Sequence, residues 1–591
     1  MIRKLIRQML AAQTLSALTV SLCLLIDNIM TGRFLGVGAI AAYELANPIL
    51  LAVGALGSML AAGVQVACSK SLGSGSRTET DRGYSSAVVL MLGISLVLVS
   101  AVAVFRRPLA TAMGAGREGE LFQQTGDYLL GFILGAPASL GALVLVPFLQ
   151  MAGRSGLLIV AVLGMTVTDI ALDLLNVLVF HGGMFGMGLA SSLSYYVAVA
   201  VAMKYFLSRN CAFRFSFRLV TLRKIRELFA GGVPAVFTMA SSVVLVFFLN
   251  RLLLSTGGSE AVAAFAVVLT MGNAANCIST GVGGVSLTLS GILYQEEDGT
   301  GLRQLLKLLT RYGIILGAAV GALLAFFAPE VVAISIPEPG RTRDLAAQGL
   351  RLFALGLIPC CLVNVLKSMY QGTERVIMTE VISVLEGAVL PGAAAFLLSR
   401  IWGLTGCWMY FAAGELLALL LTGLYVWKKN GRFSLAPESF LLLREDFGAG
   451  PDNLLEMDIR TPEEAAEAAR RAEAFCREHG QDGKMANHMA LCLEEIAGNT
   501  VIHGFDPKKD NHLSVRVQHR GTRWVLRFRD DCTAFDPVSY VPAGEEDALG
   551  IRLVMAMADD IRYTYSLNLN NLTIRLDAGK APLQAEKKEL E

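Results

Sequence analysis

The chain has 591 residues, of which 54% are hydrophobic and only 17% are charged, and its mean hydropathy is +0.55. A soluble protein is about 25% charged, so the composition excludes a wholly soluble chain. The net charge of +1 gives no support for nucleic-acid binding, and we expect no nucleic-acid partner. The ten cysteines contain no CxxC and the six histidines do not cluster, which argues against a metal site.

Apolar runs fill the chain as far as about residue 427. Each run has about 20 residues, which is enough to cross the hydrocarbon core of a bilayer. The first run follows a basic N-terminus but has no A-x-A cleavage site, so we predict an uncleaved span. The predicted α-helical spans number about twelve: 9–31, 45–68, 85–105, 126–149, 157–180, 186–206, 228–255, 261–290, 309–329, 346–369, 375–398 and 404–427.

Lysines and arginines gather in alternate loops between these spans. The loop around residues 204–226 carries seven of them, whereas the loop around residues 341–343 carries two. Basic loops stay on the cytoplasmic side of a membrane. We therefore predict a multi-pass protein of a bacterial plasma membrane with both termini in the cytoplasm.

The two halves of the apolar region resemble each other at an offset of about 222 residues. Pro137 lies opposite Pro359, and LQMAGR (149–154) lies opposite YQGTER (370–375). Six spans in each half give repeats that enter the membrane the same way up. Alternating-access transporters are built from such repeats, with the substrate between the halves.

Carboxylates interrupt two of the predicted spans. Asp27 lies near the end of the first span, and Asp169 and Asp173 lie one helical turn apart in the fifth, followed by Asn176. A charged group in a bilayer is costly and normally pairs, faces the bundle interior, or carries ions or protons. The alternative is that these are structural hydrogen-bonding groups, or that Asp27 lies at the membrane interface.

Three segments in this order resemble the multidrug and toxic compound extrusion (MATE) family: DNIMTGRFLG (27–36), GVQ…SLGSG (63–75) and LQMAGR (149–154). The resemblance covers about residues 5–430. It implies two six-helix lobes and efflux of organic cations or drug-like molecules in exchange for Na⁺ or H⁺. It also implies that Asp27 and Asp173 take part in cation coupling, with Asp169 standing where the family usually has a neutral polar residue.

After about residue 450 the chain reads as a soluble α/β domain. We predict strands over 454–459, 513–518, 524–529, 562–566 and 572–576, with a hairpin turn at 520–522. Three helices are predicted in this domain. The first begins with Thr461 as N-cap and Pro462 in the first turn, the second covers residues 485–503, and the third begins at about Leu549. The charged tail after residue 578 is predicted to be disordered.

This order of elements resembles the GHKL ATPase fold, most closely its anti-sigma-factor serine-kinase branch. EIAGN (495–499) is similar to the family's E-x-x-x-N box, and the resemblance implies that Glu495 activates a nucleophile and Asn499 holds the Mg²⁺ of bound ATP. Asp530 matches the adenine-binding aspartate, and Gly550 matches the end of the phosphate lid. Two departures weaken the case for turnover: Cys532 and Ala548 stand where the family usually has glycine.

We expect two transporter lobes (1–215 and 216–432), a linker (433–449), an ATPase-like domain (450–580) and a tail (581–591). The leading hypothesis is a cation-coupled antiporter regulated by its ATP-binding domain. One alternative is a membrane-bound sensor kinase that phosphorylates a STAS-type, anti-anti-sigma-like protein. Another is a lipid-linked saccharide flippase. An ATP-driven pump is disfavoured because the chain has no Walker A sequence.

Overall fold

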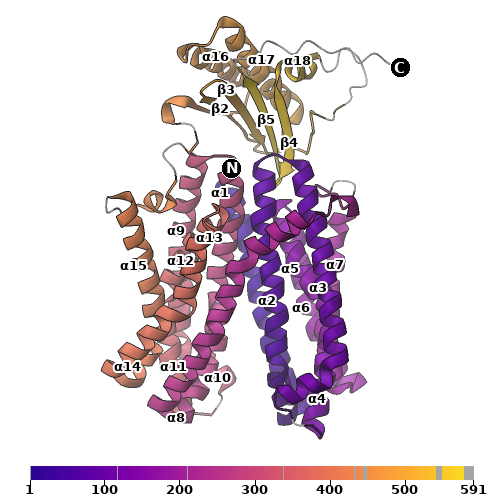
Figure 1. Cartoon of the computed structure of the whole chain (residues 1–591), viewed down its shortest axis with the longest axis vertical. Helices are drawn as coiled ribbons and strands as arrows, with labels where there is room; N and C mark the ends of the chain where they lie inside the picture. The colour runs from indigo at the N-terminus through magenta and orange to yellow at the C-terminus, as the bar shows by residue number, and fades with distance from the viewer. Residues whose placement is uncertain are drawn as a thin grey trace.

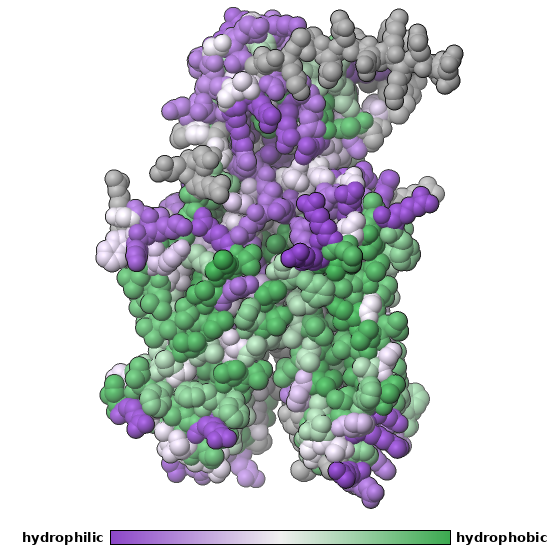
Figure 2. Space-filling view, in the orientation of Figure 1, coloured by the Kyte–Doolittle hydropathy of each residue, from purple (hydrophilic) through white to green (hydrophobic). Residues whose placement is uncertain are grey.

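In the computed structural model, two helical bundles stand side by side and a small sheet domain covers one end of both (Figure 1). On the face shown in Figure 2, mostly apolar side chains cover the middle of the bundles, and polar side chains gather at both ends. The structure describes residues 2–115, 117–208, 211–336, 338–431, 434, 436–443, 447–448, 450–538, 540 and 549–577. The predicted tail lies outside these residues.

The N-terminal lobe contains the first six predicted spans. Helices α4 and α5 form one span bent by 45°, and the fifth span ends in a π-helical turn. The elements are α1 (Ile2–Met30), η1 (Thr31–Leu35), α2 (Val37–Gly73), α3 (Arg77–Ala112), α4 (Glu120–Ile133), α5 (Ala136–Met151), α6 (Ser155–Leu175), η2 (Asn176–Phe180) and α7 (Gly183–Phe206).

The C-terminal lobe repeats this plan. Helices α11 and α12 form a second bent span, at 47°. The elements are η3 (Phe217–Leu219), α8 (Leu222–Gln295), α9 (Gly299–Phe326), α10 (Ala328–Ser335), α11 (Arg341–Ala354), α12 (Leu357–Gly372), α13 (Val376–Val384), η4 (Leu385–Val389), α14 (Leu390–Trp408) and α15 (Tyr410–Asn430).

Eight described helices are long and apolar enough to cross a membrane, or up to ten if each bent pair is one span. The 74-residue helix α8 contains two predicted spans on either side of Gly258, whose backbone is not helical. Helix α1 is the predicted first span. The architecture of about twelve spans is therefore confirmed, and the structure adds that the seventh and eighth spans are joined by a tight turn at Gly258.

The backbone itself carries the internal repeat. Residues with positive φ recur about 220 residues apart, close to the predicted offset: Gly36 with Gly258, Gly75 with Glu297, Gly153 with Glu374, and Gly183 with Gly403. Each pair lies in a turn between helices, where the left-handed conformation reverses the chain. The two halves therefore share their turns as well as their helices.

The C-terminal domain is a five-stranded antiparallel sheet in the order β1-β2-β3-β5-β4. Its helices lie on the face away from the bundles (Figure 1). The predicted strands and helices are all present, and the structure adds two short helical turns, η5 (Pro437–Leu441) and η6 (Pro451–Asn453). The predicted elements are β1 (Leu454–Ile459), α16 (Pro462–Glu478), α17 (Gly483–Asn499) continued by η7 (Thr500–Gly504), β2 (Leu513–Arg520), β3 (Arg523–Asp530), α18 (Leu549–Met557), β4 (Asp560–Ser566) and β5 (Leu569–Asp577).

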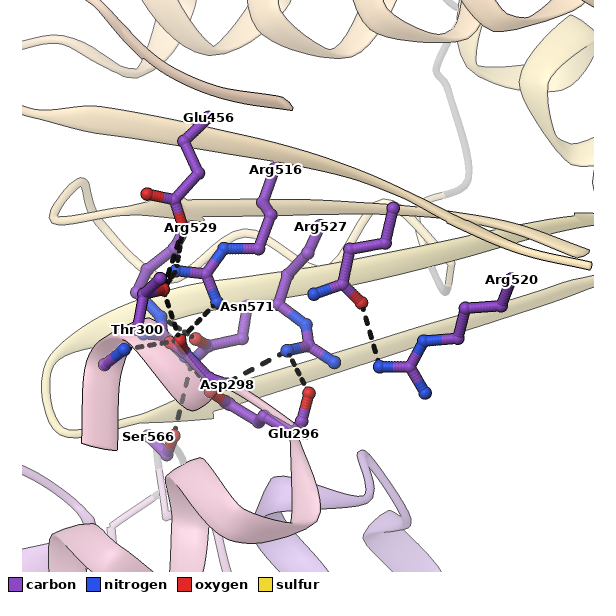
Figure 3. A network of polar contacts seen from close by, with 12 residues as sticks. Glu296, Asp298, Thr300, Glu456, Arg516, Arg520, Arg527, Arg529, Ser566 and Asn571 are labelled. Carbon is purple, nitrogen blue, oxygen red and sulfur yellow. Dashed lines mark hydrogen bonds and ion pairs between the residues drawn. The ribbon is translucent and has the colours of Figure 1, made fainter. Parts of the chain in front are cut away.

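Alternation along the strands gives this sheet two unlike faces. Apolar side chains such as Val515, Val517 and Leu526 are buried with the helices. The intervening positions, among them Arg516 and Arg527, face the bundles (Figure 3). The sheet therefore turns a basic face toward the membrane part of the molecule.

Candidate functional site

The N-terminal lobe brings its three predicted carboxylates together. Asp27 comes from α1, and Asp169 and Asp173 come from α6, and their exposed fractions are 5%, 2% and 0%. Asp27 interacts with both of the others. The hydroxyl group of Ser191 on α7 donates to Asp27 Oδ2 at 3.2 Å. The structure thus buries Asp27 inside the helical bundle.

The charges of this cluster are not compensated by neighbouring side chains. Apart from the contact between Asp27 and Asp173 themselves, Asp27 Oδ1, Asp169 Oδ1 and both carboxylate oxygens of Asp173 are buried without a hydrogen-bond donor. No lysine or arginine among the described residues forms an ion pair with any of the three. Like charges in a buried site cannot all stay ionised. The cluster therefore needs a proton or a cation.

Asn176 makes different contacts from the carboxylates. Its amide group donates to the carbonyl oxygen of Gly183 at 3.1 Å, and its Oδ1 accepts from the backbone of Gly182, also at 3.1 Å. A Cβ on Gly186 would clash with this side chain. These bonds fasten the turn between the fifth and sixth spans, so Asn176 positions the helix that carries the aspartates.

The C-terminal lobe contains a second buried charge cluster. Lys367 on α12 pairs with Glu386 in η4 at 2.5 Å, and Glu415 on α15 lies beside them at 4% exposed. Glu386 Oε2 and Glu415 Oε2 have no hydrogen-bond partner. The sequence shows these residues on separate spans but gives no sign that they meet, because three different helices bring them together.

The C-terminal domain gathers the residues expected to hold a nucleotide. Glu495 and Asn499 lie one turn apart near the end of α17, and both are half-buried. Gly550 opens α18 directly against the Glu495 carboxylate, where any Cβ would clash. A larger residue at this position would therefore displace the Glu495 carboxylate. These side-chain types fit a nucleotide with its Mg²⁺, because an amide oxygen suits a hard cation.

Asp530 ends β3 on the helix-covered face of the sheet. Its Oδ1 accepts from Asn570 Nδ2 at 2.7 Å and from the backbone N–H of Cys532 at 3.0 Å. Burial raises the pKa of Asp530, and these hydrogen bonds oppose the rise. The bonds hold the carboxyl group at one position, as an adenine-binding acceptor requires. The sequence reading missed Asn570, which lies 40 residues away.

Two positions, 532 and 548, depart from the glycine pattern of the family, and the structure describes only the first of them. Cys532 is buried and its φ is not positive, so this position does not need glycine for its backbone. Ala548 lies outside the described residues. The Cys532 departure therefore does not distort the local backbone.

The sequence reading also missed the contact between the domain and the membrane bundles. Figure 3 shows arginines of β2 and β3 reaching Glu296 and Asp298, which lie between α8 and α9. Arg529 Nη2 donates to both carboxylate oxygens of Glu296 at 2.6 Å, and Arg516 pairs with Asp298 at 2.7 Å. Charge alternation on the strands was visible in the sequence, but nothing there identified the partner of that face.

The fold defines a multi-pass membrane protein with two repeated lobes and an appended α/β domain. The chain belongs to the MatE family of multidrug efflux transporters, whose model matches residues 13–175 and 234–410. The model of the histidine kinase-like ATPase domain matches residues 460–576. The resemblances to the MATE family and to the GHKL ATPase fold are confirmed, and the assignment to the anti-sigma-factor branch stays a prediction.

Relatives resemble the membrane part of the chain. A probable multidrug resistance protein NorM of Rhizobium meliloti (strain 1021) is 24% identical over 429 residues, covering 70% of this chain and 90% of that protein. Among solved structures, MATE in complex with MaL6 has a TM-score of 0.67 at 20% identity and covers 71% of this chain and 95% of that one.

A second solved structure, an outward-facing multidrug resistance MATE transporter, has a TM-score of 0.66 at 20% identity. It covers 71% of this chain and 94% of that one. At this identity the similarity establishes the shared fold of the two lobes.

Proposed function

We propose that this protein is a secondary antiporter that exports organic cations or drug-like molecules in exchange for H⁺ or Na⁺. The uncompensated carboxylate cluster of Asp27, Asp169 and Asp173 supports the proposal most strongly. A buried anionic group without a basic partner is stabilised by a proton, by a small cation or by a cationic substrate. A site that accepts either ion or substrate lets one displace the other.

In this proposal the cluster couples the two fluxes through competition. When Asp27 and Asp173 bind the entering H⁺ or Na⁺, their negative charge is neutralised and a cationic substrate loses its attraction to the cavity. The hydroxyl group of Ser191 keeps Asp27 oriented in both states. Asp169 adds a third negative charge, so we expect this chain to favour cationic over neutral substrates.

The distribution of basic loops supports a cytoplasmic C-terminal domain. On this orientation the lobes are closed toward the cytoplasm. A Cβ on Gly73 of α2 would clash with the carbonyl oxygen of Ile292 on α8, and one on Gly291 would clash with Ser69. At the opposite end the space-filling view shows a gap between the lobes (Figure 2). The arrangement is that of an outward-facing transporter.

We further propose that the C-terminal domain binds Mg-ATP and regulates transport. ATP brings a triphosphate and an adenine ring; Asn499 would hold the metal ion and Asp530 the adenine amino group. Phosphoryl transfer to a protein partner stays a prediction from the sequence alone.

The nucleotide site gives a direct prediction. Replacing Asn499 by Ala in the full-length protein should lower Mg-ATP affinity by about 1–3 kcal/mol, about 5- to 150-fold, because the amide oxygen that would hold the Mg²⁺ is lost. Calorimetry on detergent-solubilised protein measures this change. Lys484→Ala, at an exposed position near the start of α17, is the control and should bind normally. Equal affinities of wild type and Asn499→Ala would contradict the assignment.

A further inference from the structure

The C-terminal domain touches both lobes at equivalent loops. On the N-terminal lobe, Arg562 of β4 donates to the carbonyl oxygen of Ser74 at 3.0 Å. On the C-terminal lobe, Arg520 of β2 pairs with Glu297. Gly75 and Glu297 are the repeat-related, positive-φ residues of these two loops. One sheet therefore rests on the same turn of both halves.

The contact with the C-terminal lobe is ionic and buried. We call Glu296, Glu297 and Asp298 the acidic loop; Glu296 is 6% exposed and Asp298 is 2% exposed. Burial by itself would raise the pKa of Asp298, but the charge and hydrogen bond of Arg516 hold the pKa below its usual value. Charge-assisted bonds of this kind are shorter and stronger than neutral ones. The acidic loop therefore anchors the domain while it is ionised.

The contact with the N-terminal lobe is made by a tight hairpin, here called the docking hairpin, in which Leu567 and Asn568 join β4 to β5. Both have positive φ, 59° and 61°, which is the geometry of a type I′ turn. Leucine in this conformation is strained by about 1–2 kcal/mol. The Leu567 N–H donates to the carbonyl oxygen of Met151 at 2.7 Å, and Asn568 Nδ2 donates to that of Gly153 at 2.8 Å.

The same hairpin also packs against the other lobe. Leu567 and Leu569 are each 7% exposed and belong to an apolar cluster with residues of α1 and α8, among them Ile6, Leu289 and Leu293. Burial of these two side chains offsets the backbone strain of the turn. The docking hairpin thus bonds to the backbone of the N-terminal lobe and packs against an apolar cluster to which α1 of that lobe and α8 of the C-terminal lobe both contribute.

We propose that the C-terminal domain is a clamp that holds the cytoplasmic ends of the two lobes together and so stabilises the outward-facing state. This inference deepens the regulatory part of the proposed function and rests on it. Alternating access requires the cytoplasmic ends to separate, and a rigid sheet fixed to both ends opposes that movement. Lys70 of α2 and Glu374, paired at 2.5 Å, form a further bridge between the lobes beneath the clamp.

The clamp is connected to the nucleotide site through the sheet. Arg529 and Asp530 are neighbours on β3, so one side chain points to the acidic loop and the other to the nucleotide site. Asn570, which bonds Asp530, directly follows Leu569 of the docking hairpin. A ligand that favours the docked domain therefore favours closed cytoplasmic ends, and a ligand that favours the released domain favours their separation. By linkage, opening or closing of the lobes changes the affinity for that ligand by the same factor.

Hydrogen–deuterium exchange on the full-length protein in nanodiscs tests the clamp. Glu296→Arg and Arg529→Glu should each raise exchange by at least about fivefold in two places, the docking hairpin and the facing helix ends at residues 66–73 and 285–295. The double swap should recover at least half of the protection. Arg523→Glu, at an exposed position on the same face of β3, is the matched control and should change neither place.

Two results would overturn the proposal. One is faster exchange in the docking hairpin with unchanged exchange at the helix ends. The lobes would then stay closed after the domain is released, so the docked domain would not be what holds them together. The other is full protection in both charge reversals and in Leu567→Asp, which disrupts the hairpin without touching the acidic loop. Gradient-driven transport in the same variants is measured separately. Its complete absence, also in the wild type, would refute the antiporter function and leave the exchange result intact.

Discussion

Replacing Asp173 by Asn should uncouple export from the cation gradient and reduce gradient-driven transport by about 5- to 150-fold, the range of typical coupling free energies. Asparagine keeps the size and polarity of the side chain but cannot take up a proton, and it removes one negative charge from a buried cluster of three. Because the lobes and their turns are unaffected, substrate exchange without a gradient should continue. Proteoliposomes with an imposed H⁺ or Na⁺ gradient, compared with counterflow, separate the two activities.

The neighbouring polar residue supplies a matched control. Asn176→Asp should lower expression or stability, since its amide group donates to the Gly183 carbonyl oxygen and a carboxylate cannot. It should not produce the selective loss of coupling. Asp173→Asn with an unchanged dependence on both gradients would remove this residue from the coupling mechanism.

Replacing Lys367 by Met should destabilise the C-terminal lobe by roughly 3–5 kcal/mol, because removal of one partner leaves a buried charge without compensation. Lys367 and Glu386 are 12% and 9% exposed and pair at 2.5 Å, and Glu415 adds a second carboxylate beside them. We expect a clear fall in the thermal unfolding temperature of the purified protein in detergent.

The double variant Lys367→Met with Glu386→Gln distinguishes charge from packing. Removing both charges should recover most of the lost stability, since the desolvation cost disappears with them. If the single and double variants unfold at the same temperature, the ion pair does not determine the stability of this lobe.

The sequence was sufficient to predict the spans, the repeat and the soluble domain, because each depends on local or periodic patterns. Asp169 and Asp173 were visible as a pair because they lie one turn apart on one helix. The meeting of Lys367, Glu386 and Glu415 was not predictable, since it depends on the packing of three helices. The repeat-related turn residues Gly75 and Glu297 illustrate a similar limit. Glycine in the sequence indicates a turn with positive φ, whereas glutamate at the equivalent position does not.

The docking of the domain was hidden for a related reason. A strand that alternates apolar and charged residues predicts one buried and one polar face. It does not show whether the polar face meets water or an oppositely charged loop about 220 residues earlier. Arg529 and Glu296 therefore appeared as unrelated surface charges until the fold placed them 2.6 Å apart. Leu567 gave no signal, because leucine is unusual in a type I′ turn.

If an ion gradient drives export, transport by the purified protein should follow that gradient. Purified wild-type protein is placed in liposomes without nucleotide, and the movement of a fluorescent organic cation is followed after an H⁺ or a Na⁺ gradient is imposed. Transport that follows one of the two gradients and stops when an ionophore collapses it is the predicted result. Transport that ignores both gradients but begins when Mg-ATP is supplied on the side of the C-terminal domain would contradict it.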